Sequence, residues 1–246
     1  MTPHAPDHLL VAFVVFAVPW LAVVEYRRLL QALRAGAPGA RSRSYRRTIL
    51  HEWAFGGLVA ALWAWSGRPL SSLGLSLDLD TGRGAWVGYG LTLAGCALLV
   101  AQTVAVWRGA DARAAIREQV QPFEPLLPHT ATESRWFVVV SITAGVCEEV
   151  VYRGFFMAYL APLGTLSSVA LSSLAFGVGH LYLGRTGAIR AGLLGLVTAV
   201  LYALTGSLWA PMLLHAAMDV TSGLMSRRAL ADPGGTSGPD LTPATT

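Results

Sequence analysis

Charged residues are scarce in this chain, and lysine is absent. Only 13% of the 246 residues are charged, and all 18 basic residues are arginines. Soluble domains carry about 25% charged residues, so this composition excludes an ordinary soluble domain. Hydrophobic residues make up 54% of the chain and recur in long apolar runs. We therefore expect an integral membrane protein that forms one domain.

Cysteine is nearly absent as well. The two cysteines, Cys96 and Cys147, each lie within an apolar segment. This excludes a disulfide framework and a four-cysteine zinc site. Arginine without lysine is typical of the codon composition of a GC-rich genome. We explain the net charge of +4 by where the arginines fall along the chain, and we expect no nucleic-acid partner.

Seven hydrophobic segments approach the ~20 residues that a helix needs to cross about 30 Å of hydrocarbon. They cover residues 9–25, 49–66, 85–107, 136–160, 163–182, 187–205 and 207–226. The first follows MTPHAPDH, without a basic leader or a small-residue cleavage pattern, which indicates a retained span and not a signal peptide. The sequence thus predicts an all-α bundle of about seven transmembrane helices, with six to eight compatible with the pattern.

Arginines mark alternate loops between these segments. Fifteen of the 18 lie after the first, third and fifth spans or at the start of the tail, whereas the other loops hold only Arg68 and Arg83. By the positive-inside rule, the amino terminus is outside and the carboxyl terminus is cytoplasmic. We expect a multi-pass protein of the bacterial cytoplasmic membrane.

Two segments outside the spans have compositions that predict a particular structure. ADARAAIREQV, at residues 110–120, predicts an amphipathic helix on the cytoplasmic side. The last residues, 229–246, are rich in Gly, Pro, Ser and Thr, which predicts a disordered tail. The membrane domain would then be residues 1–228.

Three adjacent or nearly adjacent charges interrupt the fourth span. Glu149 and Arg153 are four residues apart and share one helix face, in the favourable order for an ion pair. Glu148 is rotated by about 100° from Glu149 and faces elsewhere. An ion pair that braces the bundle needs only Glu149 and Arg153. We therefore interpret Glu148 as a general base that points into a cavity.

Two further polar groups lie on later spans. His180 follows Phe176 by four residues in FGVGH, and its imidazole could bind a metal or orient a water molecule. His215 and Asp219 are also four residues apart, so the carboxylate could set the tautomer of the imidazole, or the pair could act at an oxyanion.

One Glu and two His, with a second Glu to activate water, suit a zinc-type hydrolytic centre. The same groups could activate water without a metal, and composition does not choose between the two. By contrast, we interpret His51 and Glu52, beside Arg46 and Arg47 at the start of the second span, as interfacial anchors.

The three polar groups follow a recognisable pattern. E-E-x-x-x-R at Glu148–Arg153, F-x-x-x-H at Phe176–His180 and H-x-x-x-D at His215–Asp219 occur in this order on separate hydrophobic segments. Together they resemble the three motifs of the CPBP family, the CAAX proteases and bacteriocin-processing enzymes, also called the Abi family, which includes type II CAAX prenyl endopeptidases. The resemblance covers about residues 133–226.

The resemblance implies an intramembrane endopeptidase whose site opens towards the cytoplasm. Glu148 would activate a water molecule together with His180. Glu149 and Arg153 would form a supporting pair or help to bind the substrate. Phe176 completes the second motif.

The resemblance also assigns roles to the last motif. His215 and Asp219 would stabilise the oxyanion, or His215 would bind a metal ion. A zinc ion would take Glu148, His180 and His215 as ligands, and a metal-free glutamate mechanism is the open alternative. Asp219 stands where many members have Asn. An ionised acid cannot donate to an oxyanion, which favours a role in orienting His215.

The substrate would be a membrane-associated peptide or protein, such as a bacteriocin precursor, a signalling membrane protein or a lipid-anchored peptide. Phe176 and Tyr152 would contact it. Two other classes stay open: a proton-coupled transporter or channel with a Glu/His relay, and a non-catalytic scaffold or immunity protein. A transporter should show paired broken helices or an internal repeat, and the sequence shows neither.

Glu148 and His180 must lie at the same depth in the membrane to act together. Glu148 lies about 18 Å from the cytoplasmic end of the fourth predicted span, whereas His180 lies only ~3 Å from that end of the fifth. The two residues can meet only if the fourth span begins later. We therefore expect residues 136–141 at the membrane interface.

Overall fold

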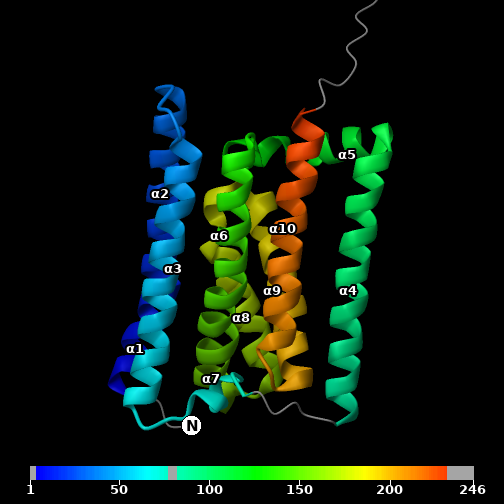
Figure 1. Cartoon of the computed structure of the whole chain (residues 1–246). Helices are drawn as coiled ribbons and strands as arrows, with labels where there is room; N and C mark the ends of the chain where they lie inside the picture. The colour runs from blue at the N-terminus through cyan, green and yellow to red at the C-terminus, as the bar shows by residue number, and fades with distance from the viewer. Residues whose placement is uncertain (1–3, 77–81, 232–246) are drawn as a thin grey trace, which may run out of the picture.

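Long helices that run side by side make up the protein. The computed structural model describes residues 4–76 and 82–231, and in these ranges every regular element is a helix. The helix axes are roughly parallel, with the short α5 lying across one end (Figure 1). The predicted all-α class is confirmed.

The helical elements follow one another with short connections. In chain order they are α1 (Ala5–Ala12), η1 (Phe13–Ala17), α2 (Val18–Arg34), α3 (Ala40–Trp65), η2 (Leu70–Leu73), α4 (Arg83–Arg108), α5 (Ala110–Val120), η3 (Gln121–Leu126), α6 (Ala131–Glu149), η4 (Val150–Phe156), α7 (Met157–Leu160), η5 (Ala161–Leu163), α8 (Thr165–Gly179), η6 (Leu181–Leu183), α9 (Gly184–Thr205) and α10 (Trp209–Ala231). The amphipathic helix predicted at residues 110–120 is α5.

Each predicted span lies in a helical segment, but not all of these segments are equally apolar. Among the described residues, three are long and apolar enough to cross a membrane: Ala5–Arg34, Arg83–Arg108 and Leu181–Thr205. α8 is apolar but shorter, with 15 residues. α3, α6 and α10 are not among these three segments, and each of them carries ionisable residues inside a predicted span. The number of spans and their orientation stay predictions.

Two boundaries differ from the sequence prediction. α6 begins at Ala131 and not near residue 136, because Thr130 and Glu133 form a capping box: the Thr130 side chain accepts from the Glu133 backbone N–H, and the Glu133 carboxylate accepts from that of Thr130. α10 continues to Ala231, so the first part of the predicted tail is helical. The rest of that tail, from residue 232, lies outside the described residues.

α6 is the central helix of the bundle. It packs against α3 on one side and α10 on the other, while α8 packs on α9 and α4 packs against α9 and α10. The α2–α3 turn, α5 and the carboxyl end of α10 all lie at the same end (Figure 1). These are the arginine-rich segments that the sequence places together on one side of the membrane.

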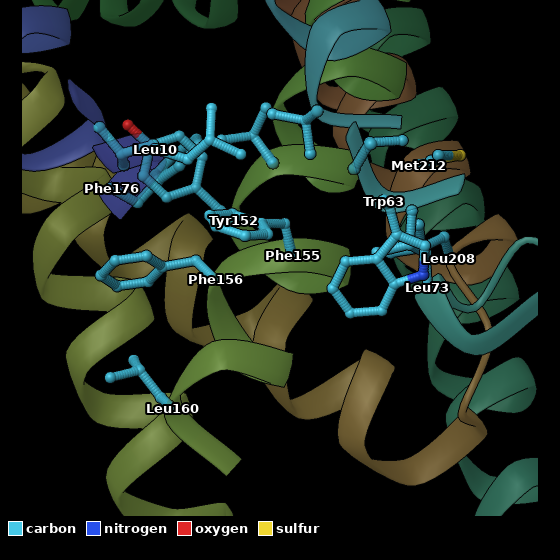
Figure 2. Close-up of a cluster of buried hydrophobic side chains, with 14 residues drawn as sticks. Leu10, Trp63, Leu73, Tyr152, Phe155, Phe156, Leu160, Phe176, Leu208 and Met212 are labelled. Atoms are coloured by element: carbon cyan, nitrogen blue, oxygen red, sulfur yellow. The ribbon is translucent and has the colours of Figure 1, made fainter. Parts of the chain in front are cut away.

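A cluster of buried rings and aliphatic side chains lies around η4, next to the motif residues (Figure 2). Phe155 has no exposed surface, and its ring meets that of Trp63 of α3 edge to face. Tyr152 and Phe176 join η4 to α8 in the same way. This cluster fixes η4 relative to α3 and α8.

The outer surface is apolar, as a lipid-facing surface should be. Leu166, Trp65 and Phe16 expose 82%, 80% and 74% of their area. Exposed apolar side chains occur on most of the long helices. Such a surface would aggregate in water and is typical of contact with membrane or a partner.

The lengths of α6 and α8 bear on the depth of the motifs. Glu148 lies about 26 Å along α6 from its start, at 1.5 Å per residue. α8 is only about 22 Å long and ends at Gly179, just before His180. α6 thus begins earlier than the predicted fourth span, and α8 is shorter than the predicted fifth span.

α6 and α10 approach closely at a glycine. A Cβ atom on Gly145 would lie 2.8 Å from both the Cβ and the backbone N of Ala216. Small residues at this position allow the backbones to approach, as is common between membrane helices. The contact holds Glu148 and Glu149 of α6 beside His215 of α10.

We predict that Gly145→Ala lowers the stability of the protein by about 1–3 kcal/mol, because the added methyl group must push α6 and α10 apart. The matched control is Gly90→Ala on α4, where a Cβ atom would meet nothing within 4 Å. Thermal unfolding of the purified protein in detergent measures both. Equal midpoints for the two variants would contradict the close approach.

Candidate active site

The segment CEEVVYR, residues 147–153, crosses a change in helix type. α6 ends at Glu149, and the next seven residues, Val150–Phe156, form a π-helix in which every residue is buried. π-helical turns are rare and occur frequently at functional sites. Here the hydroxyl of Ser172 donates to the backbone carbonyl of Tyr152 at 2.9 Å and satisfies a carbonyl of this turn from α8.

Glu149 has no exposed surface and joins two helices. Its Oε1 accepts a hydrogen bond from Nη1 of Arg153 at 3.1 Å and one from Nδ1 of His215 at 2.8 Å. An ionised carboxylate only accepts, so Nδ1 of His215 carries the proton. The predicted Glu149–Arg153 pair is therefore present, and it also sets the orientation of a histidine from α10.

Arg153 extends this network to a third helix. Its side chain is fully buried, and Nη2 donates to the backbone carbonyl of Gly195 on α9 at 2.9 Å. The guanidinium group also lies 4.5 Å from the centre of the Phe176 ring. A Cβ atom on Gly195 would lie 3.1 Å from Nη2, so a small residue is needed there. Arg153 positions other groups and does not face open space.

Glu148 is the more accessible of the two adjacent glutamates. Its side chain is 21% exposed, and Oε2 lies 3.8 Å from Nε2 of His215. Oδ2 of Asp219 lies 3.7 Å from the same nitrogen. These separations exceed a direct hydrogen bond and suit a bridging water molecule or a substrate atom.

The carboxylate that orients His215 differs from the one that the sequence indicated. We expected Asp219 to bind the imidazole and set its tautomer, but Glu149 does so through Nδ1. Asp219 stays at the other nitrogen, beyond hydrogen-bonding distance. The reason is geometric: the packing of α6 on α10 brings Glu149 closer to the ring than a residue one turn away on the same helix.

His180 lies at the carboxyl end of α8 and also has a fixed orientation. Its Nδ1 is 2.8 Å from the backbone carbonyl of Phe176, so Nδ1 donates and Nε2 is left as an acceptor. The Phe176 ring lies 4.7 Å from the His180 ring and 5.7 Å from the His215 ring, between centres. Within residues 4–76 and 82–231, His180 makes no hydrogen bond or ion pair with Glu148.

The two predicted substrate contacts lie in the core. Phe176 and Tyr152 expose 1% and 4% of their area, and both belong to the buried cluster around η4 (Figure 2). The Phe176 ring contacts both histidine rings, and Tyr152 packs against it. Their geometry favours a role in holding the site over direct contact with a substrate.

Glu52 is the site residue that the sequence reasoning missed. We interpreted it as an interfacial anchor, but its Oε2 is buried, and Glu148 and Asp219 are its charged neighbours. A signal was present: Glu52, Gly56, Val59 and Trp63 recur at helical spacing, and the last three are buried. His51 is exposed, in keeping with its interpretation.

The predicted zinc ligands can be compared with the observed geometry. Nδ1 of His215 donates to Glu149, which leaves Nε2 as the nitrogen that could bind an ion, and the Phe176 ring contacts both histidine rings. In the described part of the chain, no group of three His, Cys, Asp or Glu side chains is arranged to hold a metal ion. The ligand set of Glu148, His180 and His215 stays a prediction.

We predict that Arg153→Gln destabilises the protein by about 3–5 kcal/mol, because it leaves the buried carboxylate of Glu149 without its cation. Arg34→Gln, at an exposed position, is the control. The double variant Glu149→Gln/Arg153→Gln should lose less than the sum of the two single losses. Additive losses in thermal unfolding experiments would show that the pair does not act as a unit.

Comparison with known proteins agrees with the motifs. Residues 130–221 match the family model described as type II CAAX prenyl endopeptidase Rce1-like. The match runs from the start of α6 into α10, and helices α1 to α5 lie outside it. Neither a curated protein nor a solved structure matches the chain. The three motifs, gathered around one buried network, all lie in this matched segment, which is similar to the type II CAAX prenyl endopeptidases, a family of membrane-embedded proteases.

Proposed function

We propose that the protein cleaves a peptide bond in a membrane-associated or lipid-anchored peptide, with a water molecule activated by Glu148. The observation that carries this proposal is the division of roles between two adjacent glutamates. Glu149 is fully buried and bound to Arg153 and His215, whereas Glu148 is partly accessible and has no such partner. A general base needs this combination of access and a free acceptor oxygen.

The arrangement supports a sequence of proton transfers. Glu148 takes a proton from water as the water oxygen attacks the carbonyl carbon. When the C–N bond breaks, Glu148 returns the proton to the amine nitrogen. His180, with Nε2 free to accept, holds the water on the other side. His215 would contact the carbonyl oxygen, which becomes negatively charged during the attack.

We assign His215 to the oxyanion. With a proton on each nitrogen, it donates from Nδ1 to Glu149 and from Nε2 to the developing negative charge. The carboxylates of Glu148, Glu149 and Asp219 surround the ring and supply the counter charge. Donors that are already oriented need no reorganisation during the reaction, which is the largest advantage of such a site.

We predict that Glu148→Gln lowers kcat for peptide cleavage by about 100-fold or more, because the amide cannot accept the proton from water. Glu118→Gln on α5, an exposed position, removes the same charge and should retain full activity. A panel of membrane-associated peptides, incubated with the purified protein in nanodiscs and read by mass spectrometry, measures both. Cleavage by Glu148→Gln at the wild-type rate would remove Glu148 from the mechanism.

We predict that the reaction needs no zinc, because the described side chains are not arranged as a set of metal ligands. Purified, active protein should contain well under one equivalent of zinc, and chelation should leave the cleavage rate unchanged. Elemental analysis and the peptide assay test this. Loss of activity with a chelator, restored by added zinc, would contradict the metal-free mechanism.

A further inference from the structure

Glu52 belongs to the interior face of α3. Gly56, Val59 and Trp63 follow it at intervals of four, three and four residues, and Val59 and Trp63 expose 0% and 2% of their area. A Cβ atom on Gly56 would lie 3.2 Å from the Cβ of Cys147, so α3 and α6 are in close contact one turn from Glu52. Glu148, the residue that follows Cys147, is a charged neighbour of Glu52.

The carboxylate of Glu52 has no partner in the described part of the chain. The residue is half-buried, and its Oε2 is inaccessible to water and accepts no hydrogen bond. The charged groups that act on it are two further carboxylates, those of Glu148 and Asp219. No arginine or histidine lies within ion-pair distance of Glu52 in residues 4–76 and 82–231.

The contrast with Glu149 shows what is missing. Glu149 has a guanidinium group and an imidazole on one oxygen, whereas Glu148 and Asp219 share only the edge of His215, and Glu52 has neither group. A buried charge without a partner is costly, and within a membrane such groups mark function. The carboxyl groups of Glu52 and Asp219, on two neighbouring helices, therefore lie around the proposed base Glu148.

We propose that Glu52 is a substrate-recognition residue that accepts the positive charge of a lysine or arginine side chain next to the scissile bond. The inference rests on the proposed peptidase function and adds a substrate class to it. Glu148 and Asp219 strengthen the negative potential, while the buried Oε2 of Glu52 supplies the acceptor. A desolvated pair of this kind gives specificity, because an uncharged substrate leaves the carboxylate unpaired.

A metal ion and a shared proton fit the observations less well. No three candidate ligands are arranged around an ion in the described chain. A proton shared between two carboxylates needs a direct hydrogen bond, and Oε2 of Glu52 makes none. A long basic side chain needs no such contact within the protein, because its own donors reach the carboxylate.

The test uses pairs of peptides that differ only in one residue near the cleaved bond, arginine in one and its uncharged isostere citrulline in the other. We expect kcat/KM of the wild-type protein to favour arginine by about tenfold or more at one position, the size of a desolvated charge pair. In Glu52→Gln this ratio should fall towards one. Glu118→Gln, the matched control, should keep the wild-type ratio.

Binding of the same peptides to the Glu148→Gln protein separates this inference from the peptidase activity. If nothing is cleaved but arginine peptides bind more tightly, and Glu52→Gln abolishes the difference, the peptidase proposal fails and the recognition proposal stands. Cleavage without preference for arginine would overturn the role of Glu52 and leave the protease intact. A Glu52→Gln change that alters both peptides equally would also overturn it and indicate proton sharing with Glu148.

Discussion

The carboxylate of Glu149 is the group on which the site depends. It is fully buried, and one of its oxygens holds both Arg153 and His215. Through Arg153 the network reaches the backbone of Gly195 on α9, and through His215 it reaches α10. Burial makes each of these bonds strong and makes the loss of any one of them expensive. Three helices are thereby held in one relative position around the motif.

This network makes the two adjacent glutamates, Glu148 and Glu149, different in their partners and exposure. Because Glu149 is occupied, Glu148 is the carboxylate to which our proposal gives the role of base, with Nε2 of His215 nearest to it. The π-helical turn after Glu149 and the aromatic cluster behind it keep these side chains in place. Glu52, whose Oε2 has no hydrogen-bond partner, and Asp219 lie near Glu148. A functional site needs side chains that are held in a fixed geometry by the residues packed behind them. Here the Glu149 network and the aromatic cluster give that support.

Much of the fold was predictable from sequence, because membrane helices must bury their backbone hydrogen bonds and show their hydrophobicity in long runs. The positions of the helical segments and the Glu149–Arg153 pair followed from spacing within single segments. The start of α6 was missed although the capping residues Thr130 and Glu133 are adjacent in sequence. The late start expected for the fourth span stays a prediction, because the start of α6 shows where the helix begins and not where it enters the membrane.

The sequence by itself determined the helical class, the three motifs and the resemblance to the CAAX proteases, since each depends on local pattern and composition. Only the tertiary structure decided which carboxylate orients His215 and that Glu52 lies near Glu148. These features depend on how α3, α6 and α10 are rotated and how closely they approach. Small residues such as Gly145 and Gly56 set that approach, and spacing along one chain cannot show which helix lies opposite them.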